Sequence, residues 1–583
     1  MSLIKNIESD IVKIINNSGY DITDPMFQLS SRPDLGQYQI NCAMSLAKKY
    51  GKNPHAIATD ITKELEKDGR FTNINIAGPG FINISLKDTY LAELLTSISE
   101  DININIDKKS PRKVILDYGG ANVAKALHVG HLRSANIGEA LKRLARLLGY
   151  QILGDAHLGD YGRPLGFVVL ELKKRYPDLP YFDEKYEGDY SEVNLPITNE
   201  DLEQIYPYAS KKAKEDESYL EEGRDVTYKI QNHVRGYYDL WKKVVAISKS
   251  DIKKIYDDLN VNFELWQGES DAMEYFPKLK EIFESANILT NSEGAQIVDI
   301  KDENDSSPMP PLLFIKSNGT ISYETTDLAT ILERKINYDP DEIWYCVDTR
   351  QELHFEQVFR AARKAKLISD DVKLEVVGFG TMNGKDGKPF KTRDGGVMTL
   401  KSLINLVYEE TLKRINPNTV KEEERPSVAK TVAIAALKYA DLIPYRSTDY
   451  IFEVEKFSDL EGKTGPYLLY STIRMKSLLT KASGINYKKV HTLNSDTEKD
   501  IALTILNLPI VLTKAIESKS LNEIAEYLYK ITSQYNKFYN ENKILVEEDQ
   551  KLQESWLVLT KIVYDINILL LLDVLGIKVP EKM

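Results

Sequence analysis

A pair of histidines follows the first strongly apolar strand of the sequence. Val114-Ile115-Leu116 leads into Asp117, and a glycine-containing loop then runs to His128 and His131 at the start of a helical pattern. Side chains three residues apart lie on the same side of a helix. Because the first turn of a helix presents free backbone N–H groups and the positive end of the helix dipole, it favours a phosphate. The segment therefore predicts a phosphate-binding loop.

Such histidines can also be packed or capping side chains that hold no ligand. Here the strand, the loop, the helix and the neighbouring Lys125 all agree with a phosphate site. Imidazoles donate to phosphate oxygens as charge builds during transfer, and Gly130 leaves room for an adenine ring against the backbone. If the histidines only pack or cap, His131→Ala should alter melting more than turnover.

A second loop carries four cations. It spans Gly378–Arg393, follows a predicted strand, and contains Lys385, Lys388, Lys391 and Arg393. A glycine-rich loop of this kind can close after a nucleotide enters and neutralise a pyrophosphate leaving group. Taken alone, the same pattern predicts a solvated basic hairpin equally well.

The first loop resembles a known family. His128-Val129-Gly130-His131 resembles the HIGH signature of class I aminoacyl-tRNA synthetases, and NVAKALHVGHLRS (Asn122–Ser134) is similar to the arginyl-tRNA synthetase version. HLGDYG (His157–Gly162) resembles the family's second catalytic-domain signature. KNPHAIA and GPGFINI, both in the first hundred residues, resemble its extra N-terminal domain, which meets the tRNA elbow.

The resemblance implies an arginine–tRNA ligase of bacterial type that uses ATP with Mg²⁺ and no zinc. Arginine and ATP would give arginyl-adenylate and pyrophosphate, and the terminal adenosine of arginine tRNA would then take the arginyl group. The family usually needs bound tRNA even for the first step. It holds a KMSKS sequence in the second loop, from which PFKTR (Pro389–Arg393) departs by lacking the second lysine. Lys125 occupies the upstream position that compensates in arginyl enzymes.

A guanidinium ligand needs planar, bidentate acceptors. Five residues match the family's arginine contacts, namely Asp117, Asn122, Tyr323, Asp327 and Gln351. Asp117 ends a strand, where open α/β sheets bind ligands, and Asn122 would hold the α-amino group. Each residue alone is more often a cap or an ordinary surface group. Most other amino acids are apolar or small and would leave both acids unpaired, so arginine is favoured.

The C-terminal region is helical and rich in tyrosine. Tyr467 and Tyr470 lie three residues apart, as in the family's anticodon-stacking helix. Exposed aromatic rings stack on splayed bases, although tyrosines at helical spacing are also common in cores. The resemblance further implies anticodon contacts for Tyr539 and the terminal Met583.

The elements that must position these residues follow an α/β order. Strand, helix and strand from Val114 to Leu153 predict the first βαβ unit of a Rossmann-like, doubly wound parallel sheet. Sheet patterns return at Ile343–Val347 and Leu374–Val377. We expect a small N-terminal α/β domain that binds the tRNA elbow (1–108), a class I catalytic domain (109–400) with a helical insertion (about 163–290), a helical junction (401–460) and an all-helical anticodon-binding domain (461–583).

Three shorter features complete the N-terminal domain. Ser45–Leu65 predicts two helices joined by an Asn-Pro turn, and Asn73–Leu86 predicts a β-hairpin. The polar run Asp101–Arg112 predicts a linker.

Composition excludes several classes of protein. The chain has 583 residues, of which 42% are hydrophobic and 28% charged, an ordinary globular balance. Only two cysteines occur, Cys42 and Cys346, which excludes a disulfide framework and a multi-cysteine zinc site. The sequence has no secretion signal and no apolar run long enough to span a bilayer. We expect a cytoplasmic protein with no membrane partner, and a monomer.

Net charge decides little about a nucleic-acid partner. The total is −12, but residues 181–230 hold 14 Asp or Glu and 6 Lys or Arg, which is −8 in that segment alone. Two rival functions stay open: a class I synthetase for another amino acid, and a non-catalytic paralogue that binds tRNA. The second would be expected to lose the histidines or the substrate acids, and both sets are present.

Overall fold

The computed structural model describes residues 2–388 and 398–583, which group into two compact units. The terminal unit comprises the chain up to Lys109 together with Tyr467–Asp573 and Val579–Met583. The central unit comprises Ser110–Pro466 and Val574–Lys578. Each unit is described by itself below.

The terminal unit begins with an amphipathic helix and a small antiparallel sheet. Its first helices are α1 (Leu3–Asn17), α2 (Ala43–Tyr50), α3 (Pro54–Leu65) and α4 (Asp88–Glu100). The sheet has the order β1-β2-β4-β3, with β1 (Phe27–Leu29), β2 (Tyr38–Ile40), β3 (Phe71–Ala77) and β4 (Phe81–Leu86). The predicted Asn-Pro turn is confirmed, because the Asn53 side chain accepts from the His55 N–H at 2.8 Å and caps α3. The predicted β3–β4 hairpin is also confirmed.

The middle of the predicted linker is packed against the terminal unit. Asn105, Ile106 and Asp107 are buried. The Asn105 side-chain amide donates to the Ile505 carbonyl at 2.8 Å, within the same unit. The sequence around Asn105 does not predict this contact, because the partner lies 400 residues away along the chain.

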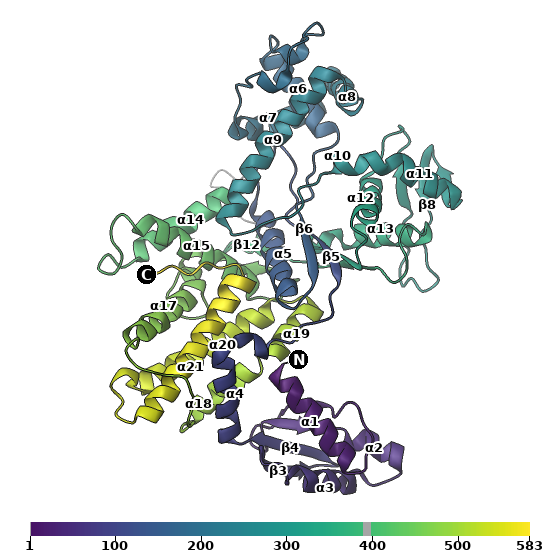
Figure 1. Cartoon of the computed structure of the whole chain (residues 1–583). Helices are drawn as coiled ribbons and strands as arrows, with labels where there is room; N and C mark the ends of the chain where they lie inside the picture. The colour runs from purple at the N-terminus through teal and green to yellow at the C-terminus, as the bar shows by residue number, and fades with distance from the viewer. Residues whose placement is uncertain (1, 389–397) are drawn as a thin grey trace. The chain divides into compact units, whose positions relative to one another are not determined.

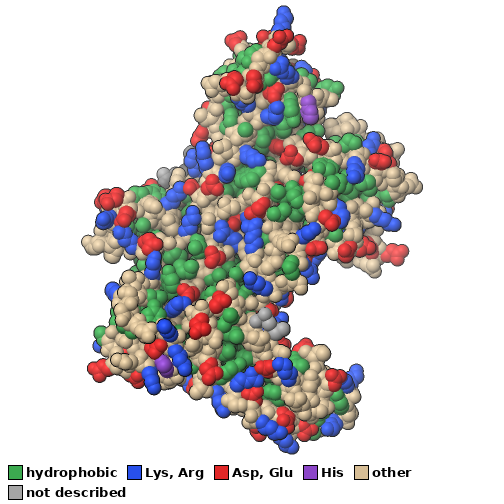
Figure 2. Space-filling view, viewed as in Figure 1, with side chains coloured by type: hydrophobic (Ala, Val, Ile, Leu, Met, Phe, Trp, Pro, Cys, Tyr) green, Lys and Arg blue, Asp and Glu red, His purple; other side chains and the backbone are tan. Residues whose placement is uncertain are grey.

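The rest of the terminal unit is helical, as expected. It contains α17 (Gly465–Lys481), α18 (Asp496–Leu506), α19 (Leu508–Ser518), α20 (Asn522–Glu541) and α21 (Gln550–Ile568). Among the described residues no single helix is long and apolar enough to cross a membrane; the bent pair α18 and α19 passes that test together, by length and composition only. On the face seen in Figure 2, Lys and Arg side chains are interspersed with Asp and Glu.

A four-stranded parallel sheet organises the central unit. Its order is β11-β10-β5-β6, with β5 (Lys113–Asp117), β6 (Gln151–Asp155), β10 (Glu342–Tyr345) and β11 (Lys373–Val376). Helix α5 (Val129–Leu147) joins β5 to β6 and lies against β6 (Figure 1), and α13 (Glu352–Lys364) lies between β10 and β11 in sequence. The predicted βαβ unit is therefore confirmed. Asp117, Asp155 and Tyr345 share one register at the carboxyl ends of their strands.

Helices α6 to α9 form one lobe of this unit in Figure 1. They are α6 (Arg163–Arg175), α7 (Asn199–Glu215), α8 (Glu217–Gln231) and α9 (Arg235–Asp258). A second lobe carries α10 (Glu269–Ala272), α11 (Phe276–Ser285) and α12 (Tyr323–Asn337), together with an antiparallel sheet of β7 (Leu289–Ser292), β8 (Ala295–Val298) and β9 (Leu312–Ile315). The sequence did not predict this sheet, whose strands are four residues each.

The remaining elements follow the parallel sheet. They are β12 (Met382–Asn383), α14 (Leu400–Arg414), α15 (Arg425–Leu442), β13 (Tyr450–Ile451) and α16 (Val454–Phe457). Strands β12 and β13 pair in parallel. The helical pattern predicted after residue 401 is confirmed, apart from the two-residue strand β13.

Candidate active site

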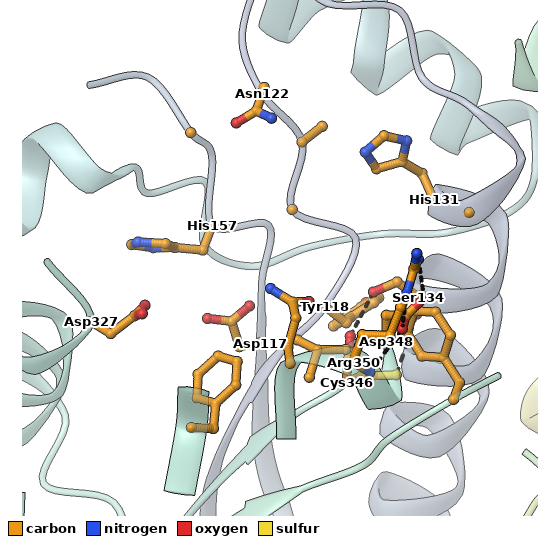
Figure 3. Close-up of a pocket in the computed structure, with 18 of the residues that line it drawn as sticks. Asp117, Tyr118, Asn122, His131, Ser134, His157, Asp327, Cys346, Asp348 and Arg350 are labelled. Carbon is orange, nitrogen blue, oxygen red and sulfur yellow. Dashed lines mark hydrogen bonds and ion pairs between the residues drawn. The ribbon is translucent and has the colours of Figure 1, made fainter. Parts of the chain in front are cut away.

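A cavity of about 400 Å³ lies in the central unit, beside the carboxyl ends of β5 and β10. Residues predicted from the sequence to act there do line it: Asp117, Asn122, His128, Gly130, His131, Asp327 and Gln351. Figure 3 shows Asp117, His157 and Asp327 on one side of the cavity and His131 and Ser134 on the other. Lys125, Tyr323, Lys385 and Lys388 do not line it.

The two histidines cap α5 and also face the cavity. His128 Nδ1 accepts from the Gly130 N–H, and His131 Nδ1 accepts from the His128 N–H, both at 3.0 Å. A nitrogen that accepts has no proton, so each neutral ring carries its proton on Nε2. Burial, with the neighbouring His128, lowers the pKa of His131 to about 3, and burial with Lys125 also lowers the pKa of His128. Both rings are therefore neutral Nε2–H donors near pH 7.

The same two side chains therefore cap the helix and line the cavity. The cap fixes each ring through Nδ1 and leaves Nε2–H available for a ligand. The ring centroids lie 4.0 Å apart. Gly130 has a further reason to be glycine, because a Cβ there would lie 2.9 Å from His128 Cε1.

Asp117 is not a free acceptor. Arg334 Nη2 donates to Asp117 Oδ2 at 2.6 Å and to Asp155 Oδ2 at 2.8 Å. Burial raises the pKa of Asp117, which Arg334 opposes. The argument that an apolar or small amino acid would leave both acids unpaired therefore does not hold for Asp117, since a buried guanidinium of the chain itself already balances it.

His157 lies beside the ion pair of Arg334 and Asp155. His157 Nδ1 lies 3.6 Å from Asp155 Oδ2, and although burial opposes it, Asp155 raises the pKa of His157 to about 9. Asp117, Asp155 and His157 have ligand atoms close enough to surround a cation. Arg334 already supplies the positive charge there, so we assign this cluster to charge balance and not to a metal.

The second predicted acid, Asp327, is also paired, in this case with a histidine. Asp327 Oδ2 lies 2.5 Å from His354 Nε2, and despite burial this contact raises the pKa of His354. Asp327 still lines the cavity. Tyr323, one turn earlier on α12, is 63% exposed and lies outside the cavity lining.

Glu269 is an acidic residue of the cavity lining that the sequence did not single out. It is the first residue of the four-residue helix α10 and lines the cavity. Burial and the negative charge of Asp327 raise its pKa to about 7. Two neighbouring carboxylates at one side of a pocket suit a planar cation. No periodic pattern marks so short a helix, so only the folded chain reveals Glu269.

The HLGDYG segment (His157–Gly162) builds the wall of the cavity. Gly159 exchanges backbone hydrogen bonds with Ala121 and Val123, and a Cβ on it would lie 2.2 Å from Asn122 Oδ1. Asp160 points away and accepts from the Ser270 N–H and hydroxyl at 2.9 and 2.6 Å. The motif therefore holds Asn122 against the cavity.

The lysine loop (residues 378–388 of those described) starts beside this cavity. Phe379 lines it, while Lys385 Nζ lies 3.2 Å from Glu455 Oε2 and 3.9 Å from Glu453 Oε2. Lys388 lies in the turn closed by its carbonyl and the Gly384 N–H. The predicted Lys391 and Arg393 fall outside the described residues.

The predicted anticodon tyrosines lie in the terminal unit. Tyr467 is half-buried, and its hydroxyl accepts from the Asn536 amide at 2.8 Å. Tyr470 is 44% exposed. The Arg474 guanidinium lies over the rings of both Tyr470 and Tyr539, at 5.6 and 4.7 Å from their centroids. Met583 is half-buried at the end of the chain.

Comparison with known proteins agrees with this geometry. Residues 93–454 match the family of class I tRNA synthetases (R), catalytic domain; residues 1–86 match the arginyl tRNA synthetase N terminal domain; and residues 468–583 match the DALR anticodon binding domain. The chain belongs to the arginyl-tRNA synthetase family.

Two relatives align with this chain over its full length. It is 43% identical to the arginine–tRNA ligase of Alkaliphilus oremlandii and 42% identical to that of Agathobacter rectalis, with all of each chain covered. The crystal structure of arginyl-tRNA synthetase from Plasmodium falciparum matches with a TM-score of 0.78 and 26% identity, over 99% of both chains. The Thermus thermophilus arginyl-tRNA synthetase also has a TM-score of 0.78, at 19% identity, which supports the fold alone.

Proposed function

We propose that this chain is an arginine–tRNA ligase whose first reaction occurs in the cavity beside β5 and β10. The observation that carries the proposal is the opposition of two kinds of group across one cavity. Neutral imidazole donors, His128 and His131, face it at one side, and the carboxylates Glu269 and Asp327 face it at the other. One side suits a phosphate and the other suits a guanidinium.

Arginine binds with its guanidinium toward Glu269 and Asp327. Asn122 holds its α-amino group, and Gln351 adds an amide beside it. Asp117 acts through Arg334, with which it is paired. Tyr323, the first residue of α12, contacts arginine at the Glu269 end. Binding at two ends places the arginine carboxylate in the middle of the cavity, toward the histidines.

ATP binds with its α-phosphate beside His128 and His131, whose Nε2–H groups donate to the phosphoryl oxygens as the arginine carboxylate attacks. Gly130 borders the adenosine. Lys125 and the cations of the lysine loop (Lys385, Lys388, Lys391 and Arg393) hold the pyrophosphate as it leaves. Mg²⁺ enters with ATP and neutralises phosphate charge, and no zinc takes part. The adenylate then passes its arginyl group to the 2′-hydroxyl of the terminal adenosine of the tRNA.

The terminal unit holds the tRNA at its anticodon. Tyr470 offers an exposed ring for base stacking, with Arg474 over the rings of both Tyr470 and Tyr539. Tyr467 and Met583 are further candidates for contact with the anticodon. Residues 1–108 meet the tRNA elbow. The enzyme works in the cytoplasm as a monomer.

The deciding experiment is arginine-dependent ATP–pyrophosphate exchange, with and without arginine tRNA. Exchange only in the presence of that tRNA would support the substrate, the reaction and the tRNA requirement together. Exchange without tRNA would remove only the requirement. A folded protein that binds tRNA and gives no exchange in either tube would favour a non-catalytic paralogue.

Glu269 gives a test of the substrate. Because the carboxylate must be charged to bind a guanidinium, kcat/KM for arginine should rise about tenfold per pH unit below pH 7 and level off above it. Glu269→Gln should flatten this rise and increase KM for arginine by roughly tenfold to a hundredfold. Glu274 is an exposed acid on the next turn of the chain, and Glu274→Gln is therefore the matched control. An unchanged KM in Glu269→Gln would exclude Glu269 from the guanidinium site.

A further inference from the structure

Helix α9 makes two hydrogen bonds to the histidine loop (residues 117–131). The Tyr256 hydroxyl donates to the Gly119 carbonyl at 2.5 Å, and Ser248 Oγ accepts from the Ala124 N–H at 3.0 Å. Ser248 and Tyr256 are eight residues apart, slightly more than two helical turns, so both project from the same face of α9. Both are buried, as is Ile252 between them. One face of a helix in the insertion therefore holds the loop at two positions, Gly119 and Ala124.

The loop needs such support because part of its backbone is strained. Ala124 has a φ of 63°, in the left-handed region that favours glycine. Ala124 is fully buried, so its N–H depends on Ser248 as an acceptor. The Lys125 N–H donates to the Asn122 carbonyl at 3.4 Å, which closes a four-residue turn around Ala124. The direction in which Lys125 leaves the backbone is therefore set at the residue that Ser248 holds.

The other end of the loop is shaped by the same region of the chain. Gly119 has a φ of 67°, and a Cβ on it would lie 2.8 Å from Phe263 Cζ and 3.3 Å from the Tyr256 hydroxyl. The loop is thus held at Gly119 and at Ala124 by side chains that belong to the insertion. No charge is involved in either contact, so neither depends on pH near neutrality.

We propose that Ser248 and Tyr256 are positioning residues for adenylate formation. They hold the loop in the one conformation that presents Lys125 and Asn122 beside the capped histidines, and they touch neither ATP nor arginine. The inference rests on the proposed role of Lys125 in stabilising the phosphates. It also gives the helical insertion a task within the first reaction, in addition to any contact that it makes with tRNA.

A double-mutant cycle tests whether Ser248 acts through Lys125. Ser248→Ala leaves the buried Ala124 N–H without an acceptor, and we expect kcat of ATP–pyrophosphate exchange to fall about tenfold. In a Lys125→Ala background the same substitution should change kcat less than about twofold, because the group that Ser248 positions is absent. Tyr256→Phe should give a loss of the same kind and smaller size.

Matched controls separate positioning from general stability. Thr227→Ala removes another buried hydroxyl of the insertion, one that bonds within α8 to the Gly223 carbonyl, and should leave kcat unchanged at a similar melting temperature. Equal losses from Ser248→Ala with and without Lys125 would overturn the proposal, as would an unchanged kcat in Ser248→Ala. A normal rate in Lys125→Ala alone would instead remove the proposed role of Lys125, and with it the route through which Ser248 acts.

Discussion

The histidine loop and the lysine loop are both proposed to act on phosphates, yet they are held differently. The histidine loop is fixed by hydrogen bonds from separate segments: Ser134 accepts from the Gly119 N–H at 2.8 Å, Gly159 bonds the loop at Ala121 and Val123, and Ser248 holds Ala124. Its two imidazoles are part of the helix cap. Loop conformation, helix start and donor direction are therefore one structure.

The described part of the lysine loop is held mainly at its base. Strands β12 and β13 pair over two residues, and a turn closes from Gly384 to Lys388. Lys385 contacts Glu453 and Glu455, whose side chains are 38% and 65% exposed. Exposed ion pairs contribute little to stability, so Lys385 can leave these acids at small cost. We therefore expect the histidine loop to supply prearranged donors and the lysine loop to supply charge that can move to a ligand.

We expect the largest effect on the rate when a hydrogen-bond donor of the histidine loop is removed. His131→Ala removes a prearranged hydrogen bond to the transition state, and kcat of pyrophosphate exchange should fall roughly 10²- to 10³-fold. It also removes a helix cap, which should lower the free energy of unfolding by about 1 kcal/mol. Exchange kinetics and urea unfolding would measure both.

His55→Ala is the control, since His55 is exposed in the terminal unit. It should change neither quantity. An unchanged kcat in His131→Ala, combined with a lower melting temperature, would leave the histidine with capping as its only role.

A smaller effect concerns the pH dependence of stability. The pKa of His131 is lowered to about 3 in the folded chain, and an unfolded histidine has a pKa of about 6.5. Below pH 6.5 the unfolded chain binds more protons, so stability should decrease as the pH falls, by about 1.4 kcal/mol per unit. Between pH 6.5 and 5 the chain should therefore lose about 2 kcal/mol more than His131→Asn, whose amide oxygen keeps the cap. Parallel curves for both proteins would contradict the buried neutral histidine.

Local patterns predicted the elements that carry both loops. Strand β5 ends at Asp117, and α5 begins at Val129, directly after the first histidine, as the apolar run and the helical spacing indicated. The ends of β5 and α5 depend on residues that are neighbours in the sequence, so they could be predicted from it. The parallel direction of the strands follows from the same strand–helix–strand pattern, whereas the order β11-β10-β5-β6 was not predicted.

Contacts between distant segments could not be predicted in this way. Arg334 reaches Asp117 across 217 residues of sequence, and nothing near either residue marks the pair. The left-handed Ala124 needs Ser248, 124 residues away, to satisfy its N–H. Glu269 belongs to a helix too short to show a period. In each case the fold brings together residues that carry no distinctive pattern in the sequence, so the sequence did not reveal that Arg334 already pairs with Asp117.

The smallest effect should come from the loop whose charge is free to move. Lys385→Ala removes one cation that can neutralise the departing pyrophosphate, so kcat of exchange should fall about tenfold. Its exposed ion pairs contribute little, so the free energy of unfolding should stay within about 0.5 kcal/mol. Glu455→Gln is the matched control: it removes the partner and keeps the lysine, and kcat should change less than about twofold. Because Lys385 leaves its acids at small cost, the loss in Lys385→Ala should appear in the rate alone. A fall in stability without a fall in rate would place Lys385 among fixed structural contacts, like those of the histidine loop, and the contrast between the two loops would fail.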